Sequence, residues 1–171
     1  MMVLWIFLGL LAVLLAVALY RAVRFRPAEE EEPLPVPLEV DDNEAARNLA
    51  ALVQCHTVSH ADPALDDERE FDKLIDLLPT LFPGVHRVCS LERIGSRGLL
   101  YHWSGNGDGA PLVLTAHYDV VPAEAERWEK SPFSGEIVDG IIFGRGTLDT
   151  KCTLSAALTA ADTLIRKGYT P

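Results

Sequence analysis

The chain has 171 residues, and its 25 acidic side chains outnumber its 15 basic ones, which gives a formal net charge of -10. A chain of this length can form one domain with a hydrophobic core. No Lys/Arg cluster lies in the polar part of the sequence, which excludes nucleic acid as a partner because phosphate binding needs a basic surface. The three cysteines include no CxxC pair, which excludes a cysteine-based structural zinc site, and we expect free, partly buried thiols.

The N-terminal region begins with an apolar run, residues 3–20, that contains no charged side chain. As a helix rising about 1.5 Å per residue, this run would extend about 27 Å, close to the thickness of a bilayer's hydrocarbon core. Three arginines follow it directly, at Arg21, Arg24 and Arg26. We therefore expect residues 1–26 to form a single-pass transmembrane anchor with a basic flank.

A cleaved signal peptide is the alternative for this region, because Ala16–Ala18 offers a small-x-small cleavage site. The anchor is favoured because no basic residue precedes the apolar run and because the arginines would directly follow the cleavage site. The positive-inside rule favours a cytoplasmic position for the remaining chain, but the sequence leaves the side of the membrane open.

An acidic, proline-rich segment separates the anchor from the rest of the chain. Four glutamates and four prolines lie between residues 27 and 38, a composition that favours an extended spacer over a packed structure. We expect a linker over residues 27–42 and a globular domain over residues 43–171.

Apolar residues at helical spacing predict two helices at the start of this domain, over residues 42–54 and 67–82. An aspartate can cap the first helix, and Pro79 is expected to end or bend the second. Two neighbouring strands, joined by a turn, are expected over residues 85–94 and 98–103.

Residues 112–116 form a short, fully apolar run that predicts a buried central strand. A hairpin is expected over residues 135–143, turning at Asp139–Gly140, and a final helix over residues 153–166, ended by Gly168. Helices, then strands, then a helix predict an α/β fold with a mixed sheet.

The first residues with candidate chemistry are His117 and Asp119, directly after the predicted strand 112–116. Ligands of open α/β sheets bind at the carboxyl ends of strands, so a histidine there would project into the crevice. Both side chains can face the same way, and a metal-binding histidine usually donates its second N–H to a carboxylate. By itself, such a pair is more often an ordinary hydrogen bond than a metal site.

The second group lies in the stretch Gly144–Lys151, which reads GRGTLDTK. Asp149 supplies a carboxylate that can bind one metal ion or bridge two. It can equally cap the final helix, a position where aspartate is strongly favoured. The pattern alone favours Arg145 and Lys151 as structural ion-pair partners.

Three motifs between residues 112 and 151 resemble the signature of the M20 metallopeptidases. They are HxDVVP at 117–122, WxxxPF at 128–133 and GRGTLDxK at 144–151, in this order. The family includes aminoacylase, glutamate carboxypeptidase and a Gly-X carboxypeptidase. The chain resembles most the branch of the Gly-X carboxypeptidase and its relatives that hydrolyse N-acyl amino acids.

The resemblance implies a zinc-dependent hydrolase that removes a C-terminal residue from a small peptide or an acyl group from an amino acid. His117 would bind one zinc ion, Asp149 would bridge two, and Asp119 would serve catalysis by orienting His117. Residues 43–171 would be part of a mixed-sheet catalytic domain. The peptide bond after Asp149 is often cis in this family.

Other parts of the family's site have no counterpart in this sequence. They are a Glu-Glu pair that includes the general base, a further acidic ligand, a histidine ligand and a dimerisation domain. We therefore expect an N-terminal fragment that is inactive alone, since two ligands do not close a dinuclear site. The rival hypothesis is an inactive, membrane-anchored binding or vestigial protein. The exact substrate and the oligomeric state stay open.

Overall fold

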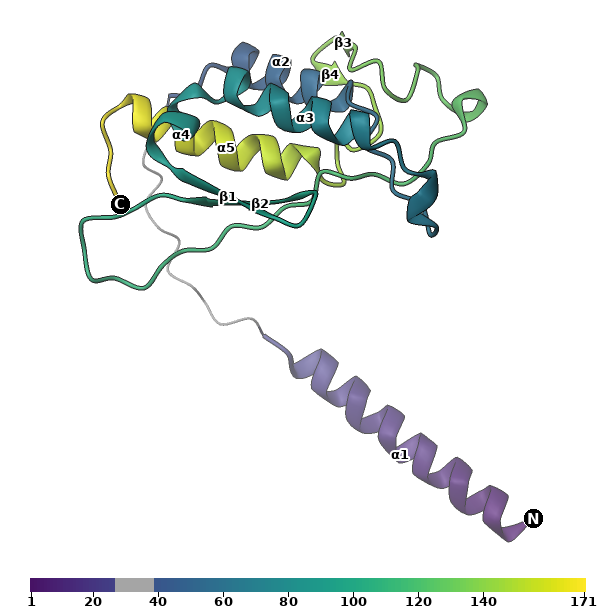
Figure 1. Ribbon diagram of the computed structural model, residues 1–171. Coiled ribbons are helices and arrows are strands. Elements are labelled where there is room, and N and C mark those ends of the chain that lie inside the picture. The colour runs from purple at the N-terminus through teal and green to yellow at the C-terminus, as the bar shows by residue number, and fades with distance from the viewer. Residues whose placement is uncertain (27–38) are drawn as a thin grey trace. The chain divides into compact units, whose positions relative to one another are not determined.

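The computed structural model describes residues 1–26 and 39–171 of the chain (Figure 1). The chain divides into two units, residues 1–38 and residues 39–171. Most of the predicted linker, residues 27–38, lies outside the described residues.

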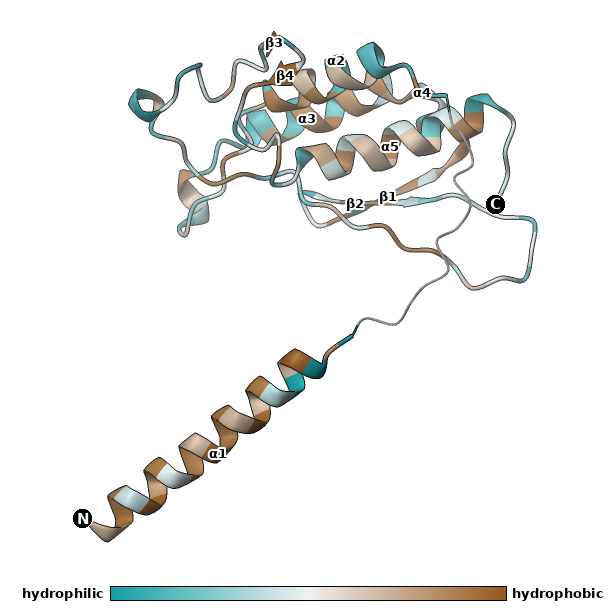
Figure 2. Cartoon of the chain, turned by 180° about the vertical axis from the view of Figure 1, so that it is seen from behind, coloured by the Kyte–Doolittle hydropathy of each residue, from teal (hydrophilic) through white to brown (hydrophobic). Residues whose placement is uncertain are grey.

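The described part of the first unit is dominated by one helix, α1 (Met2–Arg24), whose side chains are all exposed. Figure 2 shows hydrophobic residues along most of its length. Its 23 residues are long and apolar enough to cross a membrane, and an N-terminal signal sequence meets the same criteria. The predicted helix is therefore confirmed, while its role as an anchor stays a prediction.

The second unit is built from helices and two antiparallel hairpins. Its elements are α2 (Asp42–Val53), α3 (Glu68–Leu81), α4 (Pro83–Val88), β1 (Ser90–Ile94), β2 (Gly98–His102), β3 (Ile137–Val138), β4 (Ile141–Ile142) and α5 (Lys151–Arg166), with short 3-10 turns at Pro63–Leu65 and Ala125–Arg127. Helix α5 packs against α2 and α4, and the β1–β2 hairpin lies along the helices (Figure 1). Ser90 pairs with His102 at one end of that hairpin and Ile94 with Gly98 at the other.

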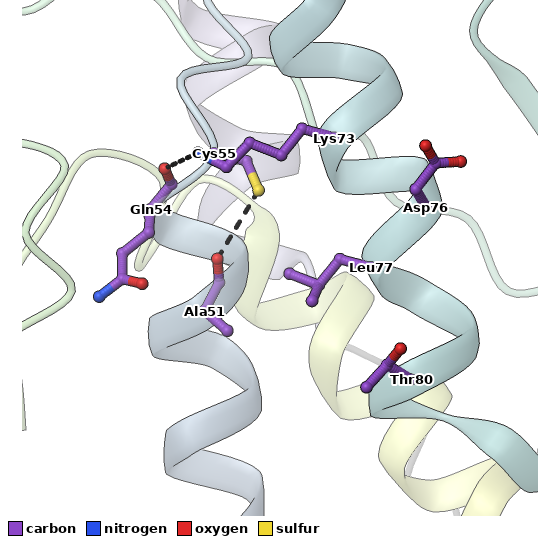
Figure 3. A pocket seen from close by; sticks show the side chains of 7 residues that line it. All are labelled: Ala51, Gln54, Cys55, Lys73, Asp76, Leu77 and Thr80. Atoms are coloured by element: carbon purple, nitrogen blue, oxygen red, sulfur yellow. Dashed lines mark hydrogen bonds between the residues drawn. The ribbon is translucent and has the colours of Figure 1, made fainter.

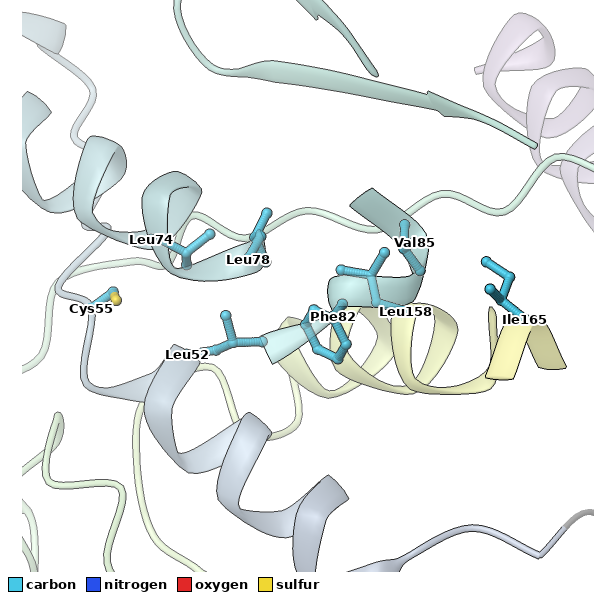
Figure 4. Close-up of a cluster of buried hydrophobic side chains, with 8 residues drawn as sticks. All are labelled: Leu52, Cys55, Leu74, Leu78, Phe82, Val85, Leu158 and Ile165. Atoms are coloured by element: carbon cyan, nitrogen blue, oxygen red, sulfur yellow. The ribbon is translucent and has the colours of Figure 1, made fainter. Parts of the chain in front are cut away.

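The hydrophobic core lies among the four helices of this unit (Figure 4). Side chains of β2, Leu99 and Tyr101, pack against it from the hairpin. The buried cluster consists of Leu52, Cys55, Leu74, Leu78, Phe82, Val85, Leu158 and Ile165. The apolar spacing that predicted α2 and α3 therefore marks the faces that these two helices bury.

Local signals set the ends of these helices. The Asp41 carboxylate accepts a hydrogen bond from the Glu44 N–H at 2.9 Å, which confirms the predicted cap of α2. Gly168 follows α5 with a φ of +77°, and the Tyr169 N–H bonds back to the Leu164 carbonyl at 3.0 Å, an arrangement that favours glycine. Pro79 lies inside α3 near its end, and the helix continues only to Leu81.

The prediction of a strand over residues 85–94 was wrong in its first half. Pro83 begins α4, and the buried Asp162 carboxylate accepts hydrogen bonds from the N–H groups of Gly84 at 2.6 Å and Val85 at 3.1 Å. A carboxylate satisfies free N–H groups at a helix N-terminus. This tertiary contact, which is distant in sequence, selects the helix.

The prediction of a buried central strand over residues 112–116 was also wrong. These residues form no strand, and the side chains of Leu112, Val113 and Leu114 are 83%, 71% and 68% exposed. Among the described residues, the sheets are two antiparallel pairs, β1–β2 and β3–β4, beside one isolated parallel bridge between Val58 and Val120. An apolar run becomes a central strand only where strands flank it.

The predicted hairpin over residues 135–143 is confirmed. Strands β3 and β4 pair through Ile137 opposite Ile142 and Val138 opposite Ile141. The turn between them has positive φ angles at Asp139 (50°) and Gly140 (80°), which is why the Asp-Gly pair favours this hairpin.

Candidate metal centre

The imidazole of His117 lies between two carboxylates. Its Nδ1 atom is 3.0 Å from the Asp119 carbonyl oxygen and 3.2 Å from the Asp119 carboxylate. Its Nε2 atom is 3.1 Å from Oδ1 of Asp149. The acceptors around Nδ1 favour a proton on that nitrogen, and the ring is oriented so that Nε2 faces Asp149.

Asp149 is presented at the turn that precedes α5, where the peptide bond to Thr150 is cis. Its carboxylate is 91% exposed, and Thr150, without a side-chain capping bond, stands at the N-cap position of α5. The alternative role of Asp149 as the helix cap is therefore wrong. The Asp149 carboxylate is therefore available to bind a ligand together with His117.

The two donors form a set that suits zinc. Two atoms each about 2.0–2.2 Å from a tetrahedral zinc ion are separated by about 3.3 Å, close to the observed separation of the His117 and Asp149 atoms. Imidazole nitrogen and carboxylate oxygen are both ordinary zinc ligands. Within the described residues, no group of three His, Cys, Asp or Glu side chains could hold a metal ion, so the pair is an incomplete ligand set.

The carboxylates also set the electrostatics of the histidine. Partial burial acts to lower the pKa of His117, but its hydrogen bonds to the Asp119 carbonyl and the Asp149 carboxylate, with both negative charges, outweigh burial and raise that pKa. A site that stabilises an imidazolium at Nε2 also favours a metal cation in place of that proton.

The pair lines a hollow of about 240 Å³. Its lining consists of Ser59, His117, Asp119, Val120, Val121, Arg145 and Asp149. The guanidinium of Arg145 lies 5.1 Å from the centre of the Trp128 ring. Among the described residues Arg145 forms no ion pair, so its predicted role as an ion-pair partner was wrong.

Lys151 was expected to form an ion pair as well, and the structure contradicts this. Its side chain is fully buried, and its ammonium donates hydrogen bonds to the carbonyl oxygens of Leu52 at 2.8 Å and Cys55 at 2.6 Å. Burial lowers the pKa of Lys151 to about 8. The side chain thus connects the start of α5 to the end of α2.

A larger hollow, of about 530 Å³, lies between α2 and α3 (Figure 3). It shares no lining residue with the hollow that contains His117 and Asp149. Its reactive side chains are a thiol and an amine, but Cys55 donates to the Ala51 carbonyl at 3.7 Å and Lys73 to the Gln54 carbonyl at 3.0 Å. Burial raises the pKa of the Cys55 thiol, which disfavours the nucleophilic thiolate. The candidate chemistry therefore belongs to the smaller hollow.

Comparison with known proteins places the chain in a family. Residues 113–171 match the model of the family described as Peptidase family M20/M25/M40. The chain is 32% identical over 173 residues to "Probable carboxypeptidase S-like 2" of Dictyostelium discoideum, covering 95% of this chain and 33% of that protein. The chain belongs to the M20 peptidase family. The alignment with "Carboxypeptidase S" of Saccharomyces cerevisiae, another relative, is 35% identical over 140 residues, covering 75% of this chain and 24% of that protein.

A second group of relatives of this M20 chain is named for a different activity. "N-fatty-acyl-amino acid synthase/hydrolase PM20D1" of Homo sapiens is 33% identical over 174 residues, covering 96% of this chain and 34% of that protein. The chain thus spans about a quarter to a third of the length of these curated relatives. The M20 family is generally metal-dependent, which agrees with the donor set of the smaller hollow.

The structure brings together all three residues that the sequence singled out, His117, Asp119 and Asp149. Sequence reasoning missed the roles of Lys151 and Thr57. The Thr57 hydroxyl is buried and donates to the Tyr118 carbonyl at 2.5 Å, beside His117. A threonine in a polar loop gives no sequence signal of such a contact, and the lysine could have been noticed only through its place in the GRGTLDTK stretch.

Proposed function

We propose that this chain contributes part of the active site of a zinc-dependent hydrolase that acts on small peptides or N-acyl amino acids. The bond cleaved is the peptide bond before a C-terminal residue or the amide bond between an acyl group and an amino acid. The observation that carries the proposal is the 3.1 Å contact between His117 and Asp149, formed by two motifs of an M20 chain.

In this proposal Nε2 of His117 would hold one zinc ion, and the Asp149 carboxylate would hold the same ion together with a second one. Zinc, when bound, would supply a Lewis acid for the amide carbonyl and would make a water molecule a better nucleophile at neutral pH. Asp119 holds the proton of His117 on Nδ1, through contacts of 3.0 Å and 3.2 Å, and so keeps the Nε2 lone pair available.

Two substrate classes remain open in this proposal, because relatives at nearly equal identity are named for carboxypeptidase and for N-fatty-acyl-amino acid hydrolase activity. Both classes share an amide carbonyl beside a free carboxylate. Purified intact protein should be assayed on a dipeptide and on an N-fatty-acyl amino acid, and release of the amino acid should be measured. Preference for one compound would assign the class.

The metal and the ligands can be tested in the same assay. Treatment with a chelator should abolish turnover, and added zinc should restore it. Asp149→Ala should abolish turnover and His117→Ala should remove a zinc ion, whereas His102→Ala, on the exposed end of β2, should change neither. Normal turnover and full zinc occupancy in Asp149→Ala or His117→Ala would refute the proposal.

We also propose that α1 anchors the protein in a membrane as a single span. The helix has 23 residues and no buried side chain, and only its last turn carries basic residues, Arg21 and Arg24. The mature protein from its own cells should retain α1 and should resist alkaline extraction from membranes. A mature N-terminus beyond residue 18 would show instead that α1 is a cleaved signal.

A further inference from the structure

One short segment, Cys55–Ser59, contacts both stretches that present the candidate ligands. We call it the support segment; it follows α2 after the intervening Gln54. On one side its Cys55 carbonyl accepts a hydrogen bond from Lys151, and on the other its Thr57 contacts the chain beside His117. The two ligands are 32 residues apart in sequence, so a common support is needed to bring them together.

The contact on the Asp149 side is an ammonium at the end of a helix. Lys151, two residues after Asp149, donates to the carbonyls of Leu52 and Cys55. Free carbonyls at a helix C-terminus carry partial negative charge, so a buried cation is stabilised there without a carboxylate. The backbone N–H of Lys151 also donates to the Gly146 carbonyl at 2.9 Å, which ties the turn that presents Asp149 to the same residue.

Close packing restricts this turn further. A Cβ atom at Gly146 would lie 3.2 Å from Cδ of Lys151 and 2.8 Å from a methyl group of Val120. Gly146 has a φ of +91°, a conformation that side chains rarely adopt. The turn that presents Asp149 is thus in contact with both Lys151 and the stretch that follows Asp119.

The contact on the His117 side is formed by a hydroxyl and by the backbone. Thr57 is fully buried, and its hydroxyl donates to the Tyr118 carbonyl. The Val120 N–H donates to the Thr57 carbonyl at 2.8 Å, and the Ser59 N–H donates to the Val120 carbonyl at 2.9 Å. His117 and Asp119 therefore lie on a stretch that is hydrogen-bonded to the support segment on both sides of Asp119.

We propose that Lys151 and Thr57 are positioning residues. Through the support segment, they hold Asp149 and His117 close enough to each other to bind one zinc ion. The inference rests on the zinc site proposed above, and it assigns the preorganisation of that site to two side chains that bind no metal. Neither ligand lies in a helix or a strand, so these polar contacts replace regular structure as the support.

The experiment is a zinc titration of the intact protein against a chelating indicator. Lys151→Met keeps an unbranched side chain one atom shorter and removes the ammonium, and Thr57→Val keeps the shape and removes the hydroxyl. Each should weaken zinc binding by about 10–100-fold, the usual effect of losing an outer support of a metal ligand. Thr57→Ser retains the hydroxyl and should restore most of the affinity.

A matched control on the same helix separates positioning from stability. Asp162 is also a buried charged residue of α5, and it bonds the N-terminus of α4 through Gly84 and Val85. Asp162→Asn should lower the free energy of unfolding, measured with chelator present, and should leave zinc affinity unchanged. If Lys151→Met fails to fold, the Thr57→Val and Thr57→Ser pair decides the question.

The outcomes distinguish this inference from the function on which it rests. Loss of zinc affinity in His117→Ala, with unchanged affinity in Lys151→Met and Thr57→Val, would overturn the positioning roles and leave the proposed function standing. Equal loss in Asp162→Asn would also overturn them, since it would show a general effect of instability. Unchanged affinity in His117→Ala would refute the proposed function itself.

Discussion

The helices of the second unit and the stretch of residues 104–150 are stabilised by different means. The helices share a buried hydrophobic cluster, to which each of α2, α3, α4 and α5 contributes. Within residues 104–150, all of which the structure describes, Val120 is the only buried member of the hydrophobic core. Yet this stretch carries both candidate zinc ligands.

This difference indicates how the site is built. In the helices, removal of apolar surface from water supplies the stability, and many side chains share the effect. The stretches that carry the ligands depend instead on a few hydrogen bonds with Cys55 and Thr57 of the support segment. Substitutions in the buried hydrophobic cluster should therefore change stability, and substitutions in the contacts that support the ligands should change zinc binding.

The largest change in stability is expected in the helical core. Leu78 is fully buried in the cluster, so Leu78→Ala leaves a cavity and should reduce the free energy of unfolding by about 2–5 kcal/mol. Urea denaturation followed by circular dichroism measures this, and zinc affinity of the folded variant should stay unchanged. Leu65→Ala is the control, because Leu65 is 65% exposed and should shift stability by no more than about 0.5 kcal/mol.

The converse result is expected at Asp119. Asp119→Ala removes the carboxylate beside Nδ1 of His117 and should reduce zinc affinity or activity by about 10–100-fold. The free energy of unfolding without zinc should change little, because the side chain is 44% exposed. Asp108→Ala, in an exposed turn, should leave both properties unchanged. A large loss of stability in Asp119→Ala would contradict the separation of the two regions.

A smaller effect is expected at the start of the helical region. Asp41→Ala removes the capping bond to the Glu44 N–H and should reduce the free energy of unfolding by about 0.5–2 kcal/mol. Asp41→Asn keeps an effective cap and should match the wild-type protein in the same denaturation experiment. Equal losses in the two variants would show that charge, not capping, is responsible.

An effect confined to acidic solution is expected at Asp66. Hydrogen bonds from Arg97 and then His60 lower the pKa of Asp66 to about 2, whereas an unfolded aspartate has a pKa of about 3.9. The stability from this carboxylate is therefore complete above the unfolded pKa and is lost as the pH falls toward the folded pKa.

Denaturation at a series of pH values tests this expectation. Asp66→Asn should be less stable than the wild-type protein at neutral pH, and the difference should shrink between about pH 4 and pH 2. Glu124→Gln alters a solvent-exposed ion pair with Arg127 and should give a nearly wild-type profile. A constant difference across the acidic range would show that the Asp66 carboxylate acts through its shape and not through its charge.

Local signals in the sequence predicted the elements that local chemistry specifies. Helices α2 and α3 follow from their apolar spacing, α5 follows from its alanine- and leucine-rich run ended by Gly168, and the β3–β4 hairpin follows from Asp139 and Gly140. Helix α4 was missed and the run 112–116 was wrongly predicted as a strand for one reason, because each outcome depends on distant neighbours. Asp162 selects α4, and no strand pairs with residues 112–116 within the part of the chain that the structure describes.

In the candidate site, too, local sequence identified some features, and others depend on contacts between residues far apart in the chain. Family motifs identified His117, Asp119 and Asp149, and the structure shows these side chains in contact. Their roles as metal ligands and orienting group stay predictions. The support that Lys151 and Thr57 provide was not predictable from the sequence, because a buried lysine bonded to carbonyls and a surface lysine look alike in a sequence.

We propose that His117 and Asp149 bind the same zinc ion. The most direct measurement is a crystal structure of the intact protein grown with zinc, with the metal located by anomalous scattering at the zinc edge. A peak within about 2.0–2.2 Å of both His117 Nε2 and an Asp149 carboxylate oxygen is the expected result. Zinc bound elsewhere, with the His117–Asp149 hydrogen bond intact, would contradict the claim.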